Sequence, residues 1–248
     1  MSRLITDIKT GYDNFIIKFG RGPLNTTKRL IWDGGIDGGY KGILATASKV
    51  KVVSDNAADA VAGGGATAII IVGQDANGLE QSEEITLTGV TPTADSVNIY
   101  SVITDAYISK TENQSEVTGL NTGVISVYQS GTPANILVKI SATQGKSLNS
   151  FYKIPSNKFG KLLNVRVYPV PGKILTCYLL IRKNGEGNGL AFNNQFIFDI
   201  NTAGPFVDLD LRITPKLLYP GAEIMLLGKV DSTTGTCSAE YAIELEAL

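Results

Sequence analysis

The sequence predicts an all-β protein made of two β-sandwich or jelly-roll-like domains preceded by an extended N-terminal arm. Short runs rich in β-branched and aromatic residues recur along the chain, as in TAIIIVG and ILTCYLLIRKN. Turn residues separate these runs at intervals of about 8–12 residues, which is typical of sandwiches and jelly rolls. No run of ten residues has the apolar periodicity of a helix.

The 248 residues divide into three segments of different character. Residues 1–42 are predicted to be the arm, residues 43–145 the first β-sandwich domain and residues 146–248 the second, jelly-roll-like domain. A domain is commonly about 100–150 residues, so the chain is long enough for two.

The arm is basic and rich in glycine. Its stretch IWDGGIDGGYKG holds five glycines and the single tryptophan of the chain. Such a segment does not form a regular element by itself, so it is expected to lie along its own body or a partner, or else to be a loosely ordered leader. The candidate partner-binding residues are Arg3, Lys9, Lys18, Arg21, Lys28, Arg29, Trp32 and Tyr40.

The first domain opens with a strand in ILATASKVKVVS, followed by a long loop, SDNAADAVAGGGA. The runs TAIIIVG and EEITLTG then flank QDANG, which predicts a hairpin whose turn has a positive φ at Gly78. Further strands are expected in SVNIYSVITDAYISKT, GVISVYQS and NILVKIS.

The second domain is predicted from six or so strands. In KLLNVRVYPV, the alternation places Leu163, Val165 and Val167 on one face and Arg166 and Tyr168 on the other. The run FVDLDLR alternates strictly, with Asp208 and Asp210 outward. The remaining strands are expected in ILTCYLLIRKN, NQFIFDI, EIMLLGKV and SAEYAIELEAL.

The composition argues against catalysis and against a cofactor. The chain has no histidine, which excludes Ser-His-Asp and Cys-His catalysis and removes the commonest metal ligand. Cys177 and Cys237 have no zinc-type spacing and stand in strand-like runs, which favours buried free thiols, with a disulfide as the alternative. We therefore expect neither an enzyme nor a metal or cofactor site.

Four acidic or glycine-rich stretches are candidate binding sites. Asp75-Ala-Asn-Gly78 resembles the start of a calcium loop, but Thr86 stands where the twelfth-position Glu is needed, so turn chemistry is the better interpretation. Asp55 and Asp59 could hold a cation, although a solvated loop is favoured. The glycine run 63–65 and the glycines of NGEGNG precede no helix and do not match a phosphate loop.

The charge balance excludes two classes of partner. Lys plus Arg number 22 and Asp plus Glu 23, which gives a net charge of −1 and no attraction to nucleic acid or to an anionic membrane. The N-terminal residues show no long apolar segment, so the chain is expected to be made in a cytoplasm and to stay soluble.

Residues 48–90 resemble a segment of virion structural proteins of tailed phages, especially marine and cyanobacterial phages. The shared pattern includes an A-x-D loop, a glycine-rich turn, a β-strand, G-x-D-A-N and T-L-x-G-x-T-P. The matching positions are Ala58, Asp59, Ala62, Gly63, Gly65, Ala66, Gly73, Asp75, Ala76, Asn77, Glu80, Ser82, Glu83, Thr86, Leu87, Gly89 and Pro92; weaker agreement follows at Gly204, Pro205, Phe206, Ser238, Ala239, Glu240 and Tyr241.

The resemblance implies an all-β module on a phage particle, made in the bacterial host cytoplasm and located in the virion. The function expected from it is that of a capsid decoration or cement protein, with the major capsid protein or other virion proteins as partners and a homotrimer as the assembly. In this hypothesis the arm runs over the shell, and the edge of the closing strand YAIELEAL lies at a subunit interface.

Two other functions remain open at this point. A tail fibre or adaptor protein would attach to a host glycan by aromatic and amide side chains, and the eligible residues are Tyr107, Tyr128, Tyr152, Phe192 and Asn193. A depolymerase would need a cross-strand pair of carboxylates; the adjacent Glu83 and Glu84 face opposite sides of a strand and do not provide one.

Overall fold

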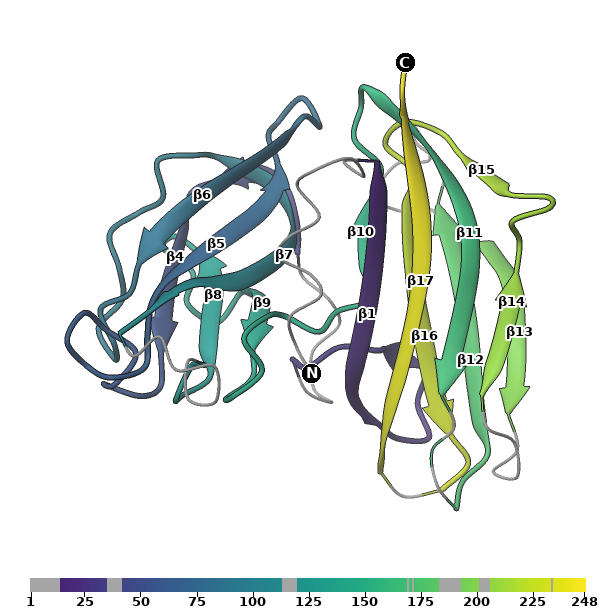
Figure 1. Ribbon diagram of the computed structural model, residues 1–248, viewed down its shortest axis with the longest axis horizontal. Helices are drawn as coiled ribbons and strands as arrows, with labels where there is room; N and C mark the ends of the chain where they lie inside the picture. Colours follow the sequence, from purple (N-terminus) through teal and green to yellow (C-terminus); the bar gives the residue numbers. More distant parts are fainter. Residues whose placement is uncertain are drawn as a thin grey trace.

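The computed structural model describes residues 14–34, 42–112, 120–168, 170, 172–182, 193–200, 206–232 and 234–248, with the backbone alone for residues 193–200. These residues form strands, turns and bends and no helix, so the prediction of an all-β chain is confirmed. The strands form four antiparallel sheets, grouped into two bodies that stand side by side (Figure 1).

The N-terminal sandwich is built from seven of these strands. Its four-stranded sheet has the order β3 (Ile43–Ser48), β7 (Tyr100–Thr111), β5 (Ala66–Gln74) and β6 (Glu80–Thr86). Its three-stranded sheet has the order β4 (Val50–Ser54), β8 (Ile125–Gln129) and β9 (Ile136–Ile140). A core of buried aliphatic residues and Tyr100 joins the two sheets, as the period-2 pattern of these strands requires.

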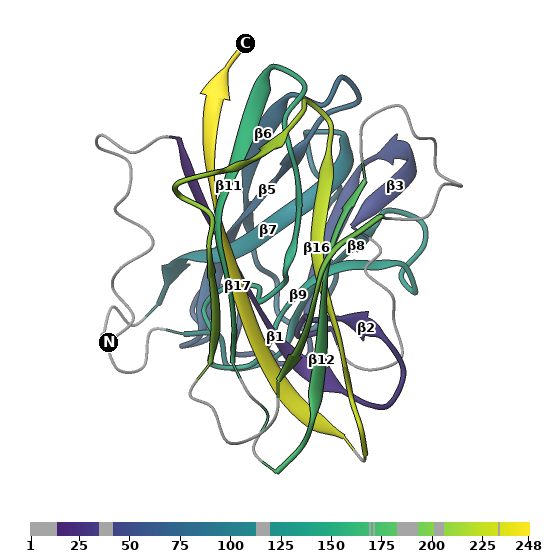
Figure 2. The same ribbon diagram turned by 90° about the vertical axis from the view of Figure 1, so that its right-hand side faces the viewer.

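The C-terminal sandwich is larger. One sheet has the order β1 (Phe15–Leu24), β17 (Gly235–Ala247), β11 (Lys158–Tyr168) and β14 (Val207–Asp210), and β15 (Lys216–Leu218) also pairs with β11. The other has the order β10 (Phe151–Lys153), β16 (Glu223–Val230), β12 (Leu175–Arg182) and β13 (Asn193–Ile200), and β2 (Arg29–Leu30) pairs with β16. Figure 2 shows this sandwich nearest the viewer.

The N-terminal segment is extended, as expected, but its described residues do not form a separate arm. Strand β1 pairs with β17 over its whole length, from Phe15 opposite Glu244 to Leu24 opposite Gly235. Leu24 and Ile31 are fully buried in the core of the C-terminal sandwich. The physical reason is that FIIKFGRGPL carries enough apolar residues to make a strand once a partner is available.

A glycine permits the chain to turn from β1 to β2. A Cβ atom on Gly22 would lie 1.6 Å from the carbonyl oxygen of Trp32, so only glycine allows the two segments to approach this closely. Gly22, in the segment predicted to be loose, is therefore needed for close packing.

The closing strand is central and not at an edge. β17 lies between β1 and β11 and makes ladder hydrogen bonds with both. The expectation that its edge is open for a subunit interface is wrong, because the N-terminal strand occupies that edge.

Two local features depart from the predicted alternation. ILATASKVKVVS forms two strands, β3 and β4, that belong to different sheets of the N-terminal sandwich. In β11 the register against β17 shifts between Leu162 and Asn164, so Leu162 is fully buried and Leu163 is not. A β-bulge of this kind reverses the faces on one side of the irregularity. The hairpin of β5 and β6 is confirmed, and Gly78 has a φ of +77°.

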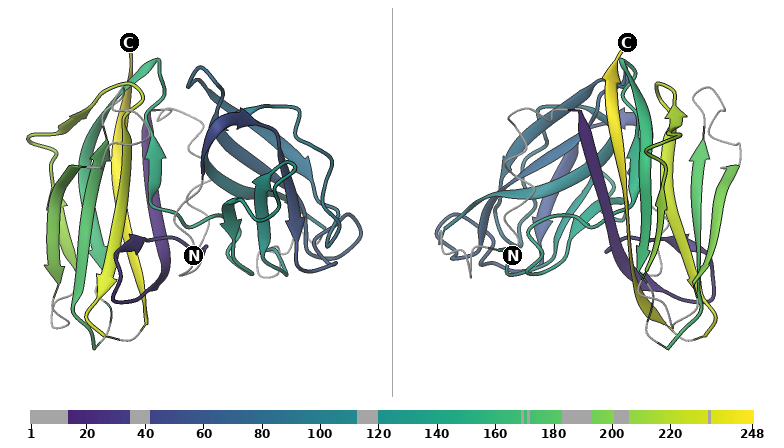
Figure 3. Two further views of the ribbon diagram at one scale, coloured as in Figure 1. Left: turned by 180° about the vertical axis from the view of Figure 1, so that it is seen from behind. Right: turned by 45° about the vertical axis from the view of Figure 1, so that its right-hand side comes forward.

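The N-terminal sandwich is inserted into the C-terminal sandwich, between β2 and β10. The two bodies share a small apolar cluster of Leu30, Trp32, Val102 and Phe151. At the tip of the β5–β6 hairpin, the N–H of Ser156 donates to the carbonyl oxygen of Gly78 at 2.9 Å. Figure 3 shows β1 and β10 bordering this junction.

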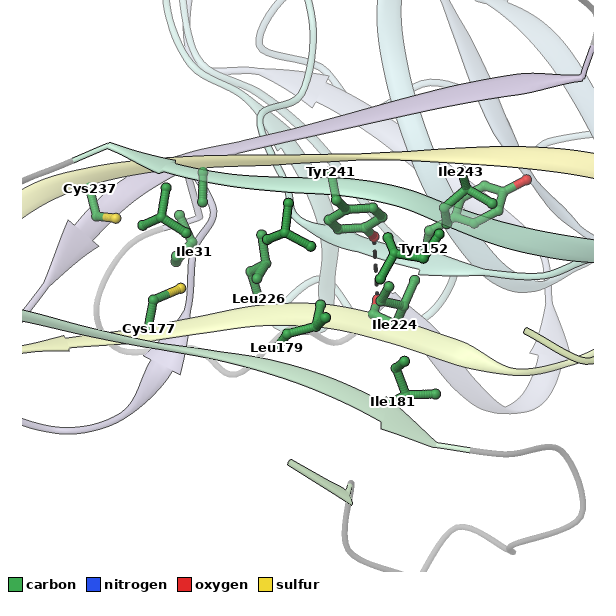
Figure 4. Close-up of a cluster of buried hydrophobic side chains, with 14 of the residues drawn as sticks. Ile31, Tyr152, Cys177, Leu179, Ile181, Ile224, Leu226, Cys237, Tyr241 and Ile243 are labelled. Atoms are coloured by element: carbon green, nitrogen blue, oxygen red, sulfur yellow. Dashed lines mark hydrogen bonds between the residues drawn. The ribbon is translucent and has the colours of Figure 1, made fainter. Parts of the chain in front are cut away.

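The core of the C-terminal sandwich contains both cysteines as buried free thiols, as the sequence favoured. Cys177 on β12 and Cys237 on β17 come from opposite sheets, and their side chains point into the space between them (Figure 4). The side chain of Tyr241 crosses the same core, and its hydroxyl donates to the carbonyl oxygen of Ser150 at 3.1 Å.

Candidate functional site

The five described members of the predicted partner-binding set do not form one surface. Arg3, Lys9 and Tyr40 lie outside the described residues. Lys18 and Trp32 are buried, whereas Arg21 and Lys28 are exposed and Arg29 is half-buried.

Trp32 and Lys18 are therefore parts of the junction and not anchors for a partner. Trp32 packs in the apolar cluster shared by the two sandwiches and bridges to Asn149. Lys18 projects from β1 toward β7 of the other sandwich. The sequence suggested external contacts because the aromatic ring of Trp32 is costly to leave in water and because Lys18 is positively charged. Both residues instead find their partners within the chain.

The basic side chains of Lys28 and Arg29 lie against their own sandwich. The ammonium group of Lys28 stands 4.2 Å from the centre of the Tyr178 ring, in a cation–π contact. The Nε of Arg29 donates to the side-chain oxygen of Asn25 at 3.3 Å.

A different surface carries exposed apolar side chains. Residues 206–219, here called the edge segment, follow the outer edge of β11 through β14 and β15. The exposed fraction is 95% for Ile213 and 54% for Tyr219, and Phe206 and Leu217 are also exposed. Four large apolar side chains on one short exposed segment form a surface suited to contact another protein.

The junction contains a compact polar cluster. The Lys18 ammonium donates to the carbonyl oxygen of Thr104 at 2.7 Å and to the Asp105 carboxylate at 3.3 Å. The side chain of Lys18 is only 4% exposed, against 27% for Asp105. The hydroxyl of Ser147 donates to the other Asp105 oxygen.

Asn149 completes this cluster and is itself fully buried. Its side-chain nitrogen donates to the same carbonyl oxygen of Thr104, at 3.2 Å. Its side-chain oxygen accepts a hydrogen bond from the N–H of Phe151 at 3.1 Å. A lysine amine and a carboxamide thus share one acceptor, and a carboxylate contacts the amine.

The titrating groups of the cluster have shifted pKa values. Burial lowers the pKa of Lys18, against the raising effect of Asp105. Burial by itself would raise the pKa of Asp105, but the charges of Lys18 and Lys146 hold it below its usual range. Burial raises the pKa of Asp33 to about 7, although the N–H of Ser141 donates to its carboxylate.

The candidate cation ligand Asp59 has a structural role. Its carboxylate is fully buried and accepts hydrogen bonds from the Ser54 hydroxyl at 2.6 Å and from three backbone N–H groups, those of Ala66, Thr122 and Gly123. The expectation of a solvated loop is wrong for this residue. Because donors surround its oxygens, the loop is closed by hydrogen bonds and not by a cation.

The hairpin residues Asp75 and Asn77 also serve the turn. One Asp75 oxygen accepts from the N–H groups of Asn77 and Leu79, at 2.8 and 2.9 Å. This is the Asx-type turn that the sequence favoured over a calcium loop. Among the described residues, no group of three or more acidic or cysteine side chains is placed to hold a metal ion.

Two of the five residues eligible for sugar binding are not accessible. Tyr128 and Tyr152 are buried, and Tyr107 is half-buried. The side chains of Phe192 and Asn193 lie outside the described part. Buried rings cannot stack on a glycan, so Tyr128 and Tyr152 are not candidate glycan-binding residues.

Three carboxylates on the strands bind donors of the chain itself. Glu83 accepts the N–H groups of Val97 and Asn98, at 2.7 and 2.9 Å. Asp208 and Glu240 both bind the guanidinium of Arg166, at 2.8 and 3.0 Å.

Comparison with known proteins does not identify a family for this chain. No family model matches the chain, and no curated protein matches it. One solved chain, from a study described as the structure of infectious bursal disease virus Gt strain, is 8% identical with a TM-score of 0.21, and the match covers 94% of this chain and 72% of that chain. A likeness this low carries no argument, so the phage resemblance stays a prediction. In the described part of the chain, no helix is long and apolar enough to span a membrane.

Sequence reasoning found Lys18 but missed Asp105, Ser147 and Asn149. These three residues stand in ordinary strand or connecting sequence, SVITDAYIS and KSLNSF, without a motif. Only the docking of β1 against β7 brings them to the lysine, so no local signal could have identified them.

Proposed function

We propose that the protein is a virion structural protein of a tailed phage, most specifically a capsid decoration protein that binds and stabilises the outer shell. The observation that carries the proposal is the edge segment, residues 206–219, with Ile213 almost fully exposed and Tyr219 more than half exposed. Exposed apolar side chains along one sheet edge favour a contact with another protein.

The rest of the molecule supports the same function. The segment that resembles phage virion proteins forms the β4–β6 region of the N-terminal sandwich, where it serves as scaffold. The two sandwiches are joined through a buried apolar cluster and a buried lysine, which makes the body suited to bridging neighbours on a shell. In this proposal the edge segment contacts the shell, and the N-terminal sandwich stands away from it.

The first experiment is the copy number of the protein in purified virions, measured by quantitative mass spectrometry against the major capsid protein. Near-stoichiometric copies support decoration of the shell. A few copies per particle would indicate a tail fibre, adaptor or other tail-vertex protein, and absence from the particle would overturn both.

The second experiment tests the edge segment directly. Ile213→Asp and Tyr219→Ser should each weaken co-sedimentation with capsids stripped of this protein, by about tenfold or more if these residues anchor the contact. The matched control is Val97→Asp, because Val97 is 83% exposed on the other sandwich. Equal binding by all three variants would contradict the proposed contact surface.

A homotrimer is part of the proposal and is tested separately. Light scattering on the purified full-length chain should give three times the mass of 26.4 kDa. If the protein is a monomer, it would decorate the shell as single subunits. The edge-segment variants would then test the capsid contact alone.

A further inference from the structure

The polar cluster at the junction brings together a nucleophile, an electrophile and a base. Lys18 supplies an amine that is buried and in contact with the Asp105 carboxylate. Asn149 supplies a fully buried carboxamide whose nitrogen shares the Thr104 carbonyl oxygen with the lysine. These residues come from three separate parts of the chain: β1, β7 and the connection that leads into β10.

We propose that Lys18 and Asn149 form an intramolecular isopeptide bond, with Asp105 as the base, so that β1 is covalently joined to the segment entering β10. This modification is independent of the proposed function, since it depends only on the residues at the junction.

The reaction balances without an oxidant or a cofactor. Asp105 accepts a proton from the Lys18 ammonium, and the neutral Nζ attacks Cγ of Asn149. A C–N bond forms to Nζ, and Nζ passes a second proton to Nδ2. The bond from Cγ to Nδ2 then breaks, and the ammonia that leaves takes up the proton held by Asp105. Lysine ammonium and a primary amide are thereby converted into a secondary amide and an ammonium ion.

The surroundings of Lys18, Asn149 and Asp105 favour this reaction. Burial lowers the pKa of Lys18, which increases the fraction of nucleophilic neutral amine. The N–H of Phe151 donates to Oδ1 of Asn149 at 3.1 Å, where negative charge develops when Cγ becomes tetrahedral. The hydroxyl of Ser147 donates to Asp105 and orients that carboxylate beside the amine.

Asn149 is a better electrophile than Asp105, although Asp105 touches the lysine. The pKa of Asp105 is held below its usual range, so its carboxyl group is ionised at neutral pH, and a carboxylate resists attack by an amine. Asn149 is neutral at every pH, and ammonia is its leaving group. A bond to Asp105 would release water, so peptide mapping and the mass of the product separate the two.

The experiment is a tryptic map of the purified full-length protein. Trypsin cuts after Lys9 and Arg21 and after Lys146 and Lys153, so a bond at Lys18 joins peptides 10–21 and 147–153 into one branched peptide. The intact protein should be lighter than its sequence by the mass of ammonia, about 17 Da. The linear peptide 10–18 should disappear because acylated lysine is not cleaved.

Variants distinguish this bond from a succinimide at Asn149, which also loses ammonia. Lys18→Arg should restore the linear peptide 147–153 at its full mass, whereas a succinimide would persist in that variant. Lys110→Arg, at an exposed lysine, is the matched control and should keep the branched peptide. Asp105→Asn preserves the side-chain shape, removes the base and should leave both peptides linear.

The proposal is overturned if the unaltered protein, after prolonged incubation at neutral pH, yields only the linear peptides 10–18 and 147–153. It is also overturned if the mass loss survives in Lys18→Arg. If that variant does not fold, the branched peptide in the unaltered protein still decides the question.

Discussion

At the scale of single residues, the buried Asp59 shows how one side chain closes a long loop. Its two oxygens accept four hydrogen bonds from residues before and after the loop and from the 122–123 segment. Charged acceptors make stronger hydrogen bonds than neutral ones, and a buried donor left without a partner costs further stability.

Asp59→Asn should therefore destabilise the protein by about 3 kcal/mol, because the new NH₂ group faces donors in place of an acceptor. Urea unfolding of the purified protein measures the change. Asp55→Asn is the control: it is exposed and accepts one N–H, that of Val124, which an Asn oxygen can still bind. Similar losses for both variants would contradict the role assigned to Asp59.

The raised pKa of Asp33 predicts that the stability of the protein depends on pH. Burial raises its pKa to about 7 in the folded protein from 3.8, and the charge of Asp105 adds to the shift. The folded state then binds more protons than the unfolded state between about pH 4 and 7. The contribution of this group is fully present below pH 4 and is lost as the pH rises through 7.

The variant Asp33→Asn should remove this slope. Lys18, Asp105 and Lys146 share the cluster and are unchanged in the variant, so the difference between the two stability curves isolates Asp33. The free energy of unfolding is measured by urea titration from pH 4 to 8. Parallel curves would show that Asp33 does not titrate in this range.

At the scale of elements, β1 is the clearest difference between sequence and structure. The local sequence around β1 is basic and rich in glycine, which predicted an arm. A strand nevertheless forms where a partner edge and an apolar face are available. The partner, β17, lies more than 200 residues away in the chain, so no local pattern could reveal the pairing.

The consequence is that β1 stabilises the C-terminal sandwich. Leu24→Ala should cost about 2–4 kcal/mol because Leu24 is fully buried in the core. Ile17→Ala, on the same strand but 52% exposed, should cost far less. Thermal and urea unfolding compare the two, and equal small effects would show that β1 is a detachable arm after all.

Other elements were predictable where a local residue sets the geometry. The β5–β6 hairpin follows from Asp75 and Gly78, whose turn chemistry is contained within five residues. The division of β3 from β4 and the bulge after Leu162 were not predictable, because both depend on which sheet each strand joins. The candidate site could be predicted only in part, for the same reason. Lys18 was identified by its charge, but tertiary packing determines which residues contact it.

At the scale of the whole molecule, the two sandwiches should unfold as one unit. Leu30, Trp32, Val102 and Phe151 come from both sandwiches and form one cluster. Gln74 of the N-terminal sandwich also donates to the carbonyl oxygen of Lys153 at 2.7 Å. Buried apolar and polar contacts of this kind couple domains that would otherwise unfold separately.

Phe151→Ala should separate the two transitions. Removing a fully buried ring costs about 3–5 kcal/mol, and here the loss falls on the contact between the sandwiches. Calorimetry should show one transition for the unaltered protein and two for the variant. Val97→Ala, at an exposed position, is the control, and a single transition in all three proteins would contradict the coupling.

The pairing of β1 with β17 also determines when each half can be completed during synthesis. Among the described residues, the core of the N-terminal sandwich uses residues 44–140 only, so this half can fold as soon as that stretch has left the ribosome. The first strand of the C-terminal sandwich must wait until residues 235–247 have been translated. The nascent chain therefore carries FIIKFGRGPL unpaired through most of translation, and its lysine, arginine and proline are of the kind that disfavours pairing of an open strand with other chains.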